Sequence, residues 1–180
     1  MKKPTLAAAA VLSLLTHASA DDAYPSRPVT MIVPFAAGGS SDVIARLIAE
    51  QMAGPLGQRM IIENVVGAGG STALTRAARA TADGHTVLVP GIPYAVNPAL
   101  FDKVPYTFAD FRAVSVVARG ALVLVAHPSL GVKSVGDLLA MARAQPGKVA
   151  YASGGIGTSP HLAGELFKRL ASVDLLQIGR

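Results

Sequence analysis

The chain of 180 residues has no cysteine and no tryptophan, and only 15% of its residues are charged. The absence of cysteine excludes a disulfide-stapled scaffold, a thiolate nucleophile and any zinc or iron–sulfur site held by cysteine. The small charged fraction, beside 51% hydrophobic residues, excludes an intrinsically disordered chain. The sequence therefore predicts a folded protein held together by packing, with one domain or two small lobes at this length.

Long hydrophobic runs and strong charge of one sign are also lacking. The apolar run at residues 6–15 is too short for a membrane span, which needs roughly 20 residues. Because Lys2 and Lys3 precede this run and Ala18-Ser19-Ala20 follows it, residues 1–20 are expected to be a signal peptide. A permanent N-terminal anchor is the alternative, which the clean cleavage pattern disfavours. Without the two lysines the formal charge falls from +5 to +3, which argues against nucleic acid as a partner.

Short β-branched runs alternate with helical periodicity in the first half of the chain after the leader. Strands are expected at residues 29–33, 60–64 and 86–89. Helices are expected at 71–80 and from about 43 to a stop either at Gly54-Pro55 or at Gly57. This order predicts parallel strands joined by right-handed crossovers, hence a layered α/β fold. In such a fold, ligands bind outside the carboxyl ends of the strands.

The middle of the chain is less regular. Residues 91–106 are expected to form an irregular connection or a short helix. Two apolar runs, 113–118 and 121–126, either lie antiparallel to one another or pass between lobes. The residue pattern leaves both alternatives open.

The second half repeats the α/β pattern. Ser134 with Asp137 three residues on resembles a capping box and predicts a helix running to about residue 144. A strand at 149–153 leads into a helix with Ser159 as N-cap and Pro160 at its first position, ending near residue 170. A last buried strand is expected at 173–178.

Three loops share one pattern, in which a buried strand runs into glycines and then into a helix. They span Pro34–Asp42, Val65–Ser71 and Ser153–Ser159. Backbone N–H groups at glycines and at a helix start attract anions, so each loop is a candidate carboxylate or phosphate site, although a single loop of this kind is more often an ordinary turn. None matches a Walker A or a Gly-x-Gly-x-x-Gly motif, which disfavours nucleotides.

Candidate catalytic groups are few. A serine hydrolase using Ser153 or Ser159 with His161 is the enzymatic alternative, but the closely spaced Ser159 and His161 do not face each other at a helix start and no third group is evident. No histidine pair has metal-ligand spacing and no nucleophile elbow occurs. We therefore expect no catalysis, no cofactor and no metal. Asp42 either accepts a ligand hydroxyl or ammonium group, or stabilises the positive end of its own helix.

A series of short motifs follows in a fixed order along residues 24–165. The motifs are Tyr24–Val29, Val33–Asp42, Leu56–Gln58, Glu63–Asn64, Gly67–Gly70, Asp83–Thr86, Asn97–Pro98, Asp110–Phe111, Tyr151–Thr158 and His161–Glu165. Each motif is weak alone, but their number, order and spacing resemble the Bug-type solute receptors, the periplasmic binding proteins of tripartite tricarboxylate transporters.

This resemblance implies a two-lobed α/β fold of the periplasmic-binding-protein (Venus flytrap) type. Lobe 1 is expected to span residues 21–118 and lobe 2 residues 119–180. Family members are much longer, so both lobes are expected to be incomplete and the fold to lack its C-terminal part.

The resemblance also implies an exported, periplasmic receptor that captures a carboxylated organic anion for membrane transporter subunits, as a monomer and without nucleic acid. The alternatives are a non-functional fragment, a solute-sensing interaction protein and, less favoured, the serine hydrolase. The residues that the resemblance assigns to ligand binding are Phe35, Gly38, Gly39, Ser40, Asp42, Ser153, Gly157, Thr158 and His161.

Overall fold

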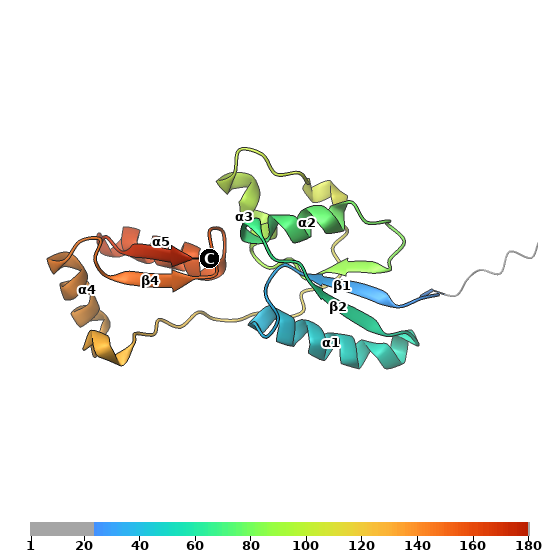
Figure 1. Ribbon diagram of the computed structural model, residues 1–180, viewed down its shortest axis with the longest axis horizontal. Coiled ribbons are helices and arrows are strands. Elements are labelled where there is room, and N and C mark those ends of the chain that lie inside the picture. The colour runs from blue at the N-terminus through green and yellow to red at the C-terminus, as the bar shows by residue number, and fades with distance from the viewer. Residues whose placement is uncertain (1–23, 180) are drawn as a thin grey trace, which may run out of the picture.

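The computed structural model describes residues 24–179, and the signal peptide expected at residues 1–20 lies outside them. Two α/β units are joined by an extended segment (Figure 1). We call residues 24–110 lobe 1, residues 111–127 the linker and residues 128–179 lobe 2. The expected boundary between residues 118 and 119 falls inside the linker and stays a prediction.

Lobe 1 is built on a parallel sheet of three strands in the order β2-β1-β3, with Val29 opposite Met60 and Thr30 opposite Thr86. Its strands and α-helices, in chain order, are β1 (Val29–Val33), α1 (Ser40–Leu56), β2 (Met60–Asn64), α2 (Ser71–Ala78), β3 (Thr86–Leu88) and α3 (Pro93–Leu100). Short 3-10 helices, η2 (Ala68–Gly70) and η3 (Phe108–Asp110), complete it. The predicted β-α-β-α-β order is confirmed, and the irregular stretch after β3 contains the short helix that was one of the two expectations.

The central strand β1 carries the core of lobe 1. Val29, Met31, Ile32 and Val33 are all buried, because α1 covers one face of the sheet and α2 lies over the other (Figure 1). A strand covered on both faces needs mostly apolar residues, which explains this run of Val, Met and Ile; the half-buried Thr30 is the one polar position in β1. α1 ends where Gly57 adopts a left-handed conformation, at one of the two predicted stops.

Lobe 2 holds a two-stranded parallel sheet, β4-β5. Its elements are the 3-10 helix η4 (Pro128–Leu130), α4 (Val135–Ala144), β4 (Ala150–Ser153), α5 (Ser159–Ala171) and β5 (Leu176–Gly179). Leu138, Ala142, Val149 and Leu175 form its buried core. As predicted, Ser134 caps α4, and its Oγ accepts a hydrogen bond from the Asp137 N–H at 3.1 Å.

Two expected boundaries in lobe 2 were wrong by a few residues. The N-cap of α5 is Thr158 instead of Ser159, because Pro160 takes the second helical position. The last strand starts at Leu176 instead of Val173, because Ser172 adopts a left-handed conformation after α5 and Leu175 turns into the core.

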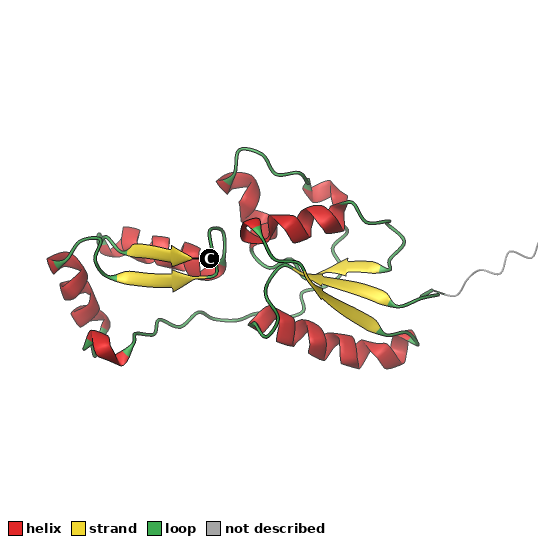
Figure 2. Cartoon of the chain, viewed as in Figure 1, coloured by secondary structure: helices red, strands yellow, loops and turns green. Residues whose placement is uncertain are grey.

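The linker connects the lobes without regular secondary structure (Figure 2). Of the two alternatives for its apolar runs, passage between the lobes is the one observed. Its valines lie in solvent, with Val114, Val123 and Val125 exposed by 89%, 79% and 82%. In residues 24–179, no helix has both the length and the apolar character that a membrane crossing requires.

Candidate functional site: two glycine-rich loops at facing sheet ends

The strands of each sheet run toward the other lobe (Figure 2). The loops that follow β1 and β4 therefore lie at the sheet ends that face each other. These loops, together with the end of β4 and the first turns of α1 and α5, hold all nine predicted ligand-binding residues, five in lobe 1 and four in lobe 2. The carboxyl ends of parallel strands are where ligands bind in α/β folds, so the topology gives the loops the expected position.

The loop after β1 presents an exposed surface. Phe35 is half-buried, with its ring against Gly91. Gly38, Gly39 and Ser40 are exposed at the start of α1. The first N–H groups of a helix have no partner within the helix, so the start of α1 offers hydrogen-bond donors and partial positive charge to an anion.

Asp42 lies beneath this surface and is 2% exposed. Its Oδ2 accepts hydrogen bonds from Arg46 Nε at 2.9 Å and from the Gly38 N–H at 2.8 Å, and its Oδ1 accepts one from Asn64 Nδ2 at 2.9 Å. The Arg46 guanidinium, followed by the Gly38 N–H and the Asn64 amide, holds the pKa of this carboxyl well below its usual range. The charged carboxylate therefore ties the loop to α1 and β2, and its contact with a ligand stays a prediction.

Sequence reasoning missed two partners in this network. Arg46 stands four residues after Asp42 on α1, a spacing that brings an acid and a base together on a helix face. Asn64 ends β2 opposite Val33, and its Nδ2 also donates to the Phe35 carbonyl at 3.0 Å. The helical spacing is visible in the sequence, whereas the approach of Asn64 depends on the strand register.

The loop after β4 in lobe 2 is stabilised by hydrogen bonds from its own residues and from β5. Thr158 Oγ1 donates to the Gly155 carbonyl at 2.7 Å. Ser153 Oγ accepts from the Gly155 N–H at 3.2 Å and from Gln177 Nε2 at 2.8 Å. Thr158 is buried and Ser153 half-buried, so both side chains shape this loop.

His161 lies in the first turn of α5, and its Nδ1 accepts from the Gly157 N–H at 3.3 Å. A ring nitrogen that accepts a hydrogen bond carries no proton, so this contact requires the neutral ring. Among residues 24–179, neither Ser153 nor Ser159 hydrogen-bonds to His161. A hydrolase needs its nucleophile and base in mutual reach, so the geometry disfavours that alternative.

The third glycine-rich loop, after β2, leads through η2 into α2. Asn97 of α3 braces it, with Nδ2 donating to Ser71 Oγ at 2.9 Å and to the Gly69 carbonyl at 3.3 Å. Asn97 is fully buried. Sequence reasoning noted it only as part of an Asn-Pro motif, because its partners come from 26 and 28 residues earlier in the chain.

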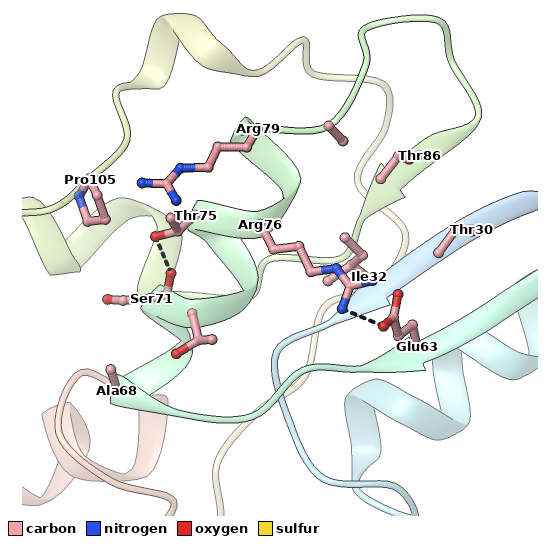
Figure 3. Close-up of a pocket in the computed structure, with 12 residues that line it drawn as sticks. Thr30, Ile32, Glu63, Ala68, Ser71, Thr75, Arg76, Arg79, Thr86 and Pro105 are labelled. Atoms are coloured by element: carbon pink, nitrogen blue, oxygen red, sulfur yellow. Dashed lines mark hydrogen bonds and ion pairs between the residues drawn. The ribbon is translucent and has the colours of Figure 1, made fainter.

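A cavity of about 900 Å³ lies elsewhere, between α2 and the face of the lobe 1 sheet (Figure 3). Thr30, Ile32 and Arg79 help to line it, as does Arg76, whose Nη1 pairs with Glu63 Oε1 at 2.6 Å. None of the nine predicted residues lines this cavity. It opens on a face of the lobe 1 sheet, and Ala68 and Ser71 of the glycine-rich loop after β2 also line it.

The chain matches the family model described as tripartite tricarboxylate transporter family receptor over residues 44–179. Protein BugT of Bordetella pertussis is 42% identical over 150 residues, which cover 82% of this chain and 46% of BugT. The chain spans about half the length of the curated relatives it matches.

Solved structures match the fold as well as the sequence. The R. palustris protein Rpa4515, solved with adipate, matches with a TM-score of 0.82 and 38% identity over 87% of this chain and 53% of that one. MatC of Rhodopseudomonas palustris, solved with malate, matches with a TM-score of 0.75 and 34% identity, over 87% of this chain and 54% of MatC. The periplasmic binding protein BugD matches with a TM-score of 0.69 and 30% identity, over 87% of this chain and 52% of BugD.

These matches confirm the resemblance drawn from the short motifs and the α/β fold of the periplasmic-binding-protein type, of which the chain covers about half. They also support a binding protein over an enzyme. The chain belongs to the tripartite tricarboxylate transporter receptor family.

Proposed function

We propose that this chain is a solute-binding receptor that holds a carboxylated organic anion between its two lobes. The observation that carries the proposal is the placement of two strand–glycine–helix loops at sheet ends that face each other. Each loop leads into a helix of more than ten residues, α1 or α5, whose first N–H groups suit a carboxylate.

The chemistry of the loops favours an acid with two anionic groups. One carboxylate meets the start of α1 in lobe 1, and the other meets the start of α5 in lobe 2. Two relatives of this fold were solved with dicarboxylates, adipate in Rpa4515 and malate in MatC, which supports this class of ligand.

The proposal also covers the location of the receptor, its transporter partner and its oligomeric state. Its leader pattern and its likeness to the periplasmic binding protein BugD support export to the periplasm. The family is named for receptors of tripartite tricarboxylate transporters, which supports delivery of the anion to membrane subunits of that kind. We propose that the receptor acts as a monomer in this delivery.

Isothermal calorimetry of the chain from residue 21 onward tests the ligand class. Adipate and malate are expected to bind, and glucose is expected not to bind. A neutral sugar as the best ligand would refute the proposal, as would the absence of binding by any organic acid.

Two charge variants test the location of the site. Ser40→Asp and Ser159→Asp each put a negative charge in the first turn of a helix, where an acidic residue favours the helix and preserves the fold. Repulsion between like charges is expected to weaken dicarboxylate binding about tenfold or more. Ser40→Asn and Ser159→Asn are the matched neutral controls, and equal affinities within each Asp and Asn pair contradict the proposed site.

A further inference from the structure

The two lobes touch at a contact built around two glycines. Gly69 of η2 has φ +58°, and a Cβ at this position would overlap the carbonyl oxygen of Ile156 in lobe 2. Gly157 of lobe 2 has φ +85°, and a Cβ there would stand 2.8 Å from Asn97 Oδ1 and 3.4 Å from Leu100 Cδ1 in lobe 1. Each lobe thus sets a glycine against backbone or side-chain atoms of the other.

Asn97 shows that this contact limits the approach without binding the lobes together. Its Nδ2 donates to the Gly69 carbonyl and to Ser71 Oγ, which fixes the orientation of the amide and turns Oδ1 toward Gly157. Among the described residues, Oδ1 is buried and has no hydrogen-bond donor. Water can reach this oxygen once the lobes separate, so the touching state leaves an acceptor unsatisfied.

In the described part of the chain, no polar interaction between the lobes compensates for the unsatisfied Asn97 Oδ1. Within residues 24–179, no hydrogen bond or ion pair joins lobe 1 to lobe 2. The contact therefore rests on van der Waals distance between glycine Cα atoms and oxygen atoms.

We infer that the contact of Gly69 with Ile156 and of Asn97 with Gly157 is a stop that sets the closest approach of the two lobes. Ile156 and Gly157 belong to the same loop as Ser153 and Thr158, so any displacement of the stop moves the predicted ligand loop of lobe 2. The stop thereby determines the length of the organic acid that fits between the lobes. This effect on ligand length is the length part of the inference, and it rests on the proposed function.

Distances between spin labels test the stop without any ligand. Because the chain has no cysteine, cysteines placed at the exposed positions Glu50 on α1 and Arg169 on α5 carry labels at single sites. Gly69→Ala and Gly157→Ala are expected to shift the label-to-label distance to longer values, since the added methyl group keeps the lobes apart.

Two matched controls separate the stop from backbone strain. Gly57 in lobe 1 and Gly131 in lobe 2 also have left-handed φ values, +66° and +69°, and nothing lies within 4 Å of a Cβ at either position. Gly57→Ala and Gly131→Ala are therefore expected to leave the distance unchanged. The stop is overturned if Gly69→Ala keeps the parent distance or if the controls shift by the same amount.

Affinities for succinate and adipate test the length part. Gly69→Ala is expected to change the affinity ratio several-fold in favour of the longer adipate. A longer label-to-label distance with an unchanged ratio of the two affinities overturns the length part, while the stop itself is supported. If the parent chain binds neither acid, the proposed function and the length part both fail, and the label distances still decide on the stop.

Discussion

At the scale of single residues, Asp42 explains how the exposed glycine-rich loop after β1 is kept in place. Its carboxylate is buried under the loop and receives hydrogen bonds from the loop backbone at Gly38, from α1 at Arg46 and from β2 at Asn64. A charge this far from water requires such partners, because an unpaired buried carboxylate would be strongly destabilising.

Asp42→Asn is expected to lower the thermal midpoint at pH 7, because the amide removes the charge that faces Arg46 and replaces an acceptor with a donor. The pKa of Asp42 is lowered in the folded protein. The stability it contributes is therefore complete above the ordinary carboxyl pKa, near 3.9, and is lost as pH falls through the folded value. The difference between parent and variant should shrink as pH drops below about 5, as measured by thermal unfolding between pH 7 and pH 3.

Asp102→Asn is the matched control at an exposed position. Its effect is expected to stay within about 0.5 kcal/mol. An Asp42→Asn variant with the parent midpoint at pH 7 would show that the network does not stabilise the fold.

At the scale of elements, the packing of α5 on β4 depends on a glycine, because this residue has no side chain at the point of contact. Tyr151 of β4 lies across α5 at Gly164, where a Cβ would overlap the aromatic ring. Its hydroxyl donates to Glu165 Oε1 at 2.8 Å. Burial, with a smaller contribution from Glu165, raises the pKa of Tyr151 to about 12, so the hydroxyl keeps its proton and remains a donor at neutral pH.

Gly164→Ala is expected to destabilise lobe 2 by about 1–3 kcal/mol, the usual effect of overpacking. Gly136 of α4 is the matched control, since it is also a helical glycine of lobe 2 but a Cβ there would only reach ordinary contact with Ser134 Oγ at 3.5 Å. Gly136→Ala should be neutral or stabilising by up to about 1 kcal/mol. Urea unfolding measures both variants, and a Gly164→Ala variant as stable as Gly136→Ala contradicts the packing argument.

At the scale of the whole molecule, apolar surface is concentrated in the linker. Val114, Val123 and Val125 are each at least 79% exposed. Exposed apolar chain in extended conformation favours association with other chains. The linker is therefore the segment of the described structure from which we expect aggregation to start.

A triple Val→Thr variant at positions 114, 123 and 125 is expected to bind less of a hydrophobic dye and to aggregate more slowly than the parent chain. Its free energy of unfolding should change by less than about 0.5 kcal/mol per substitution, because these side chains pack against little. Val33→Thr in β1 is the control, since Val33 is fully buried and an unpartnered hydroxyl there costs about 1–3 kcal/mol. Unchanged dye binding in the triple variant would place the exposed apolar surface elsewhere.

The local patterns that predicted the elements are set by near neighbours in the chain. The buried strand β1, the Ser134 cap of α4 and the end of α1 at Gly57 all follow from residues within one or two turns. The error at Ser159 also concerns a local detail, since helix ends are uncertain by a residue or two, whereas the shifted start of β5 depends on the burial of Leu175 in the lobe 2 core.

The amino-acid sequence by itself determined the α/β class, the order of the elements, the glycine-rich loops and the family. Only the tertiary structure decided that Asn64 reaches Asp42, that Asn97 braces the loop before α2, and that Gly69 and Gly157 meet the opposite lobe. The physical reason is the range of the interactions. Backbone propensity and hydrophobic periodicity act over a few residues, whereas these contacts join groups from separate elements, whose distance depends on strand register and on how the lobes meet.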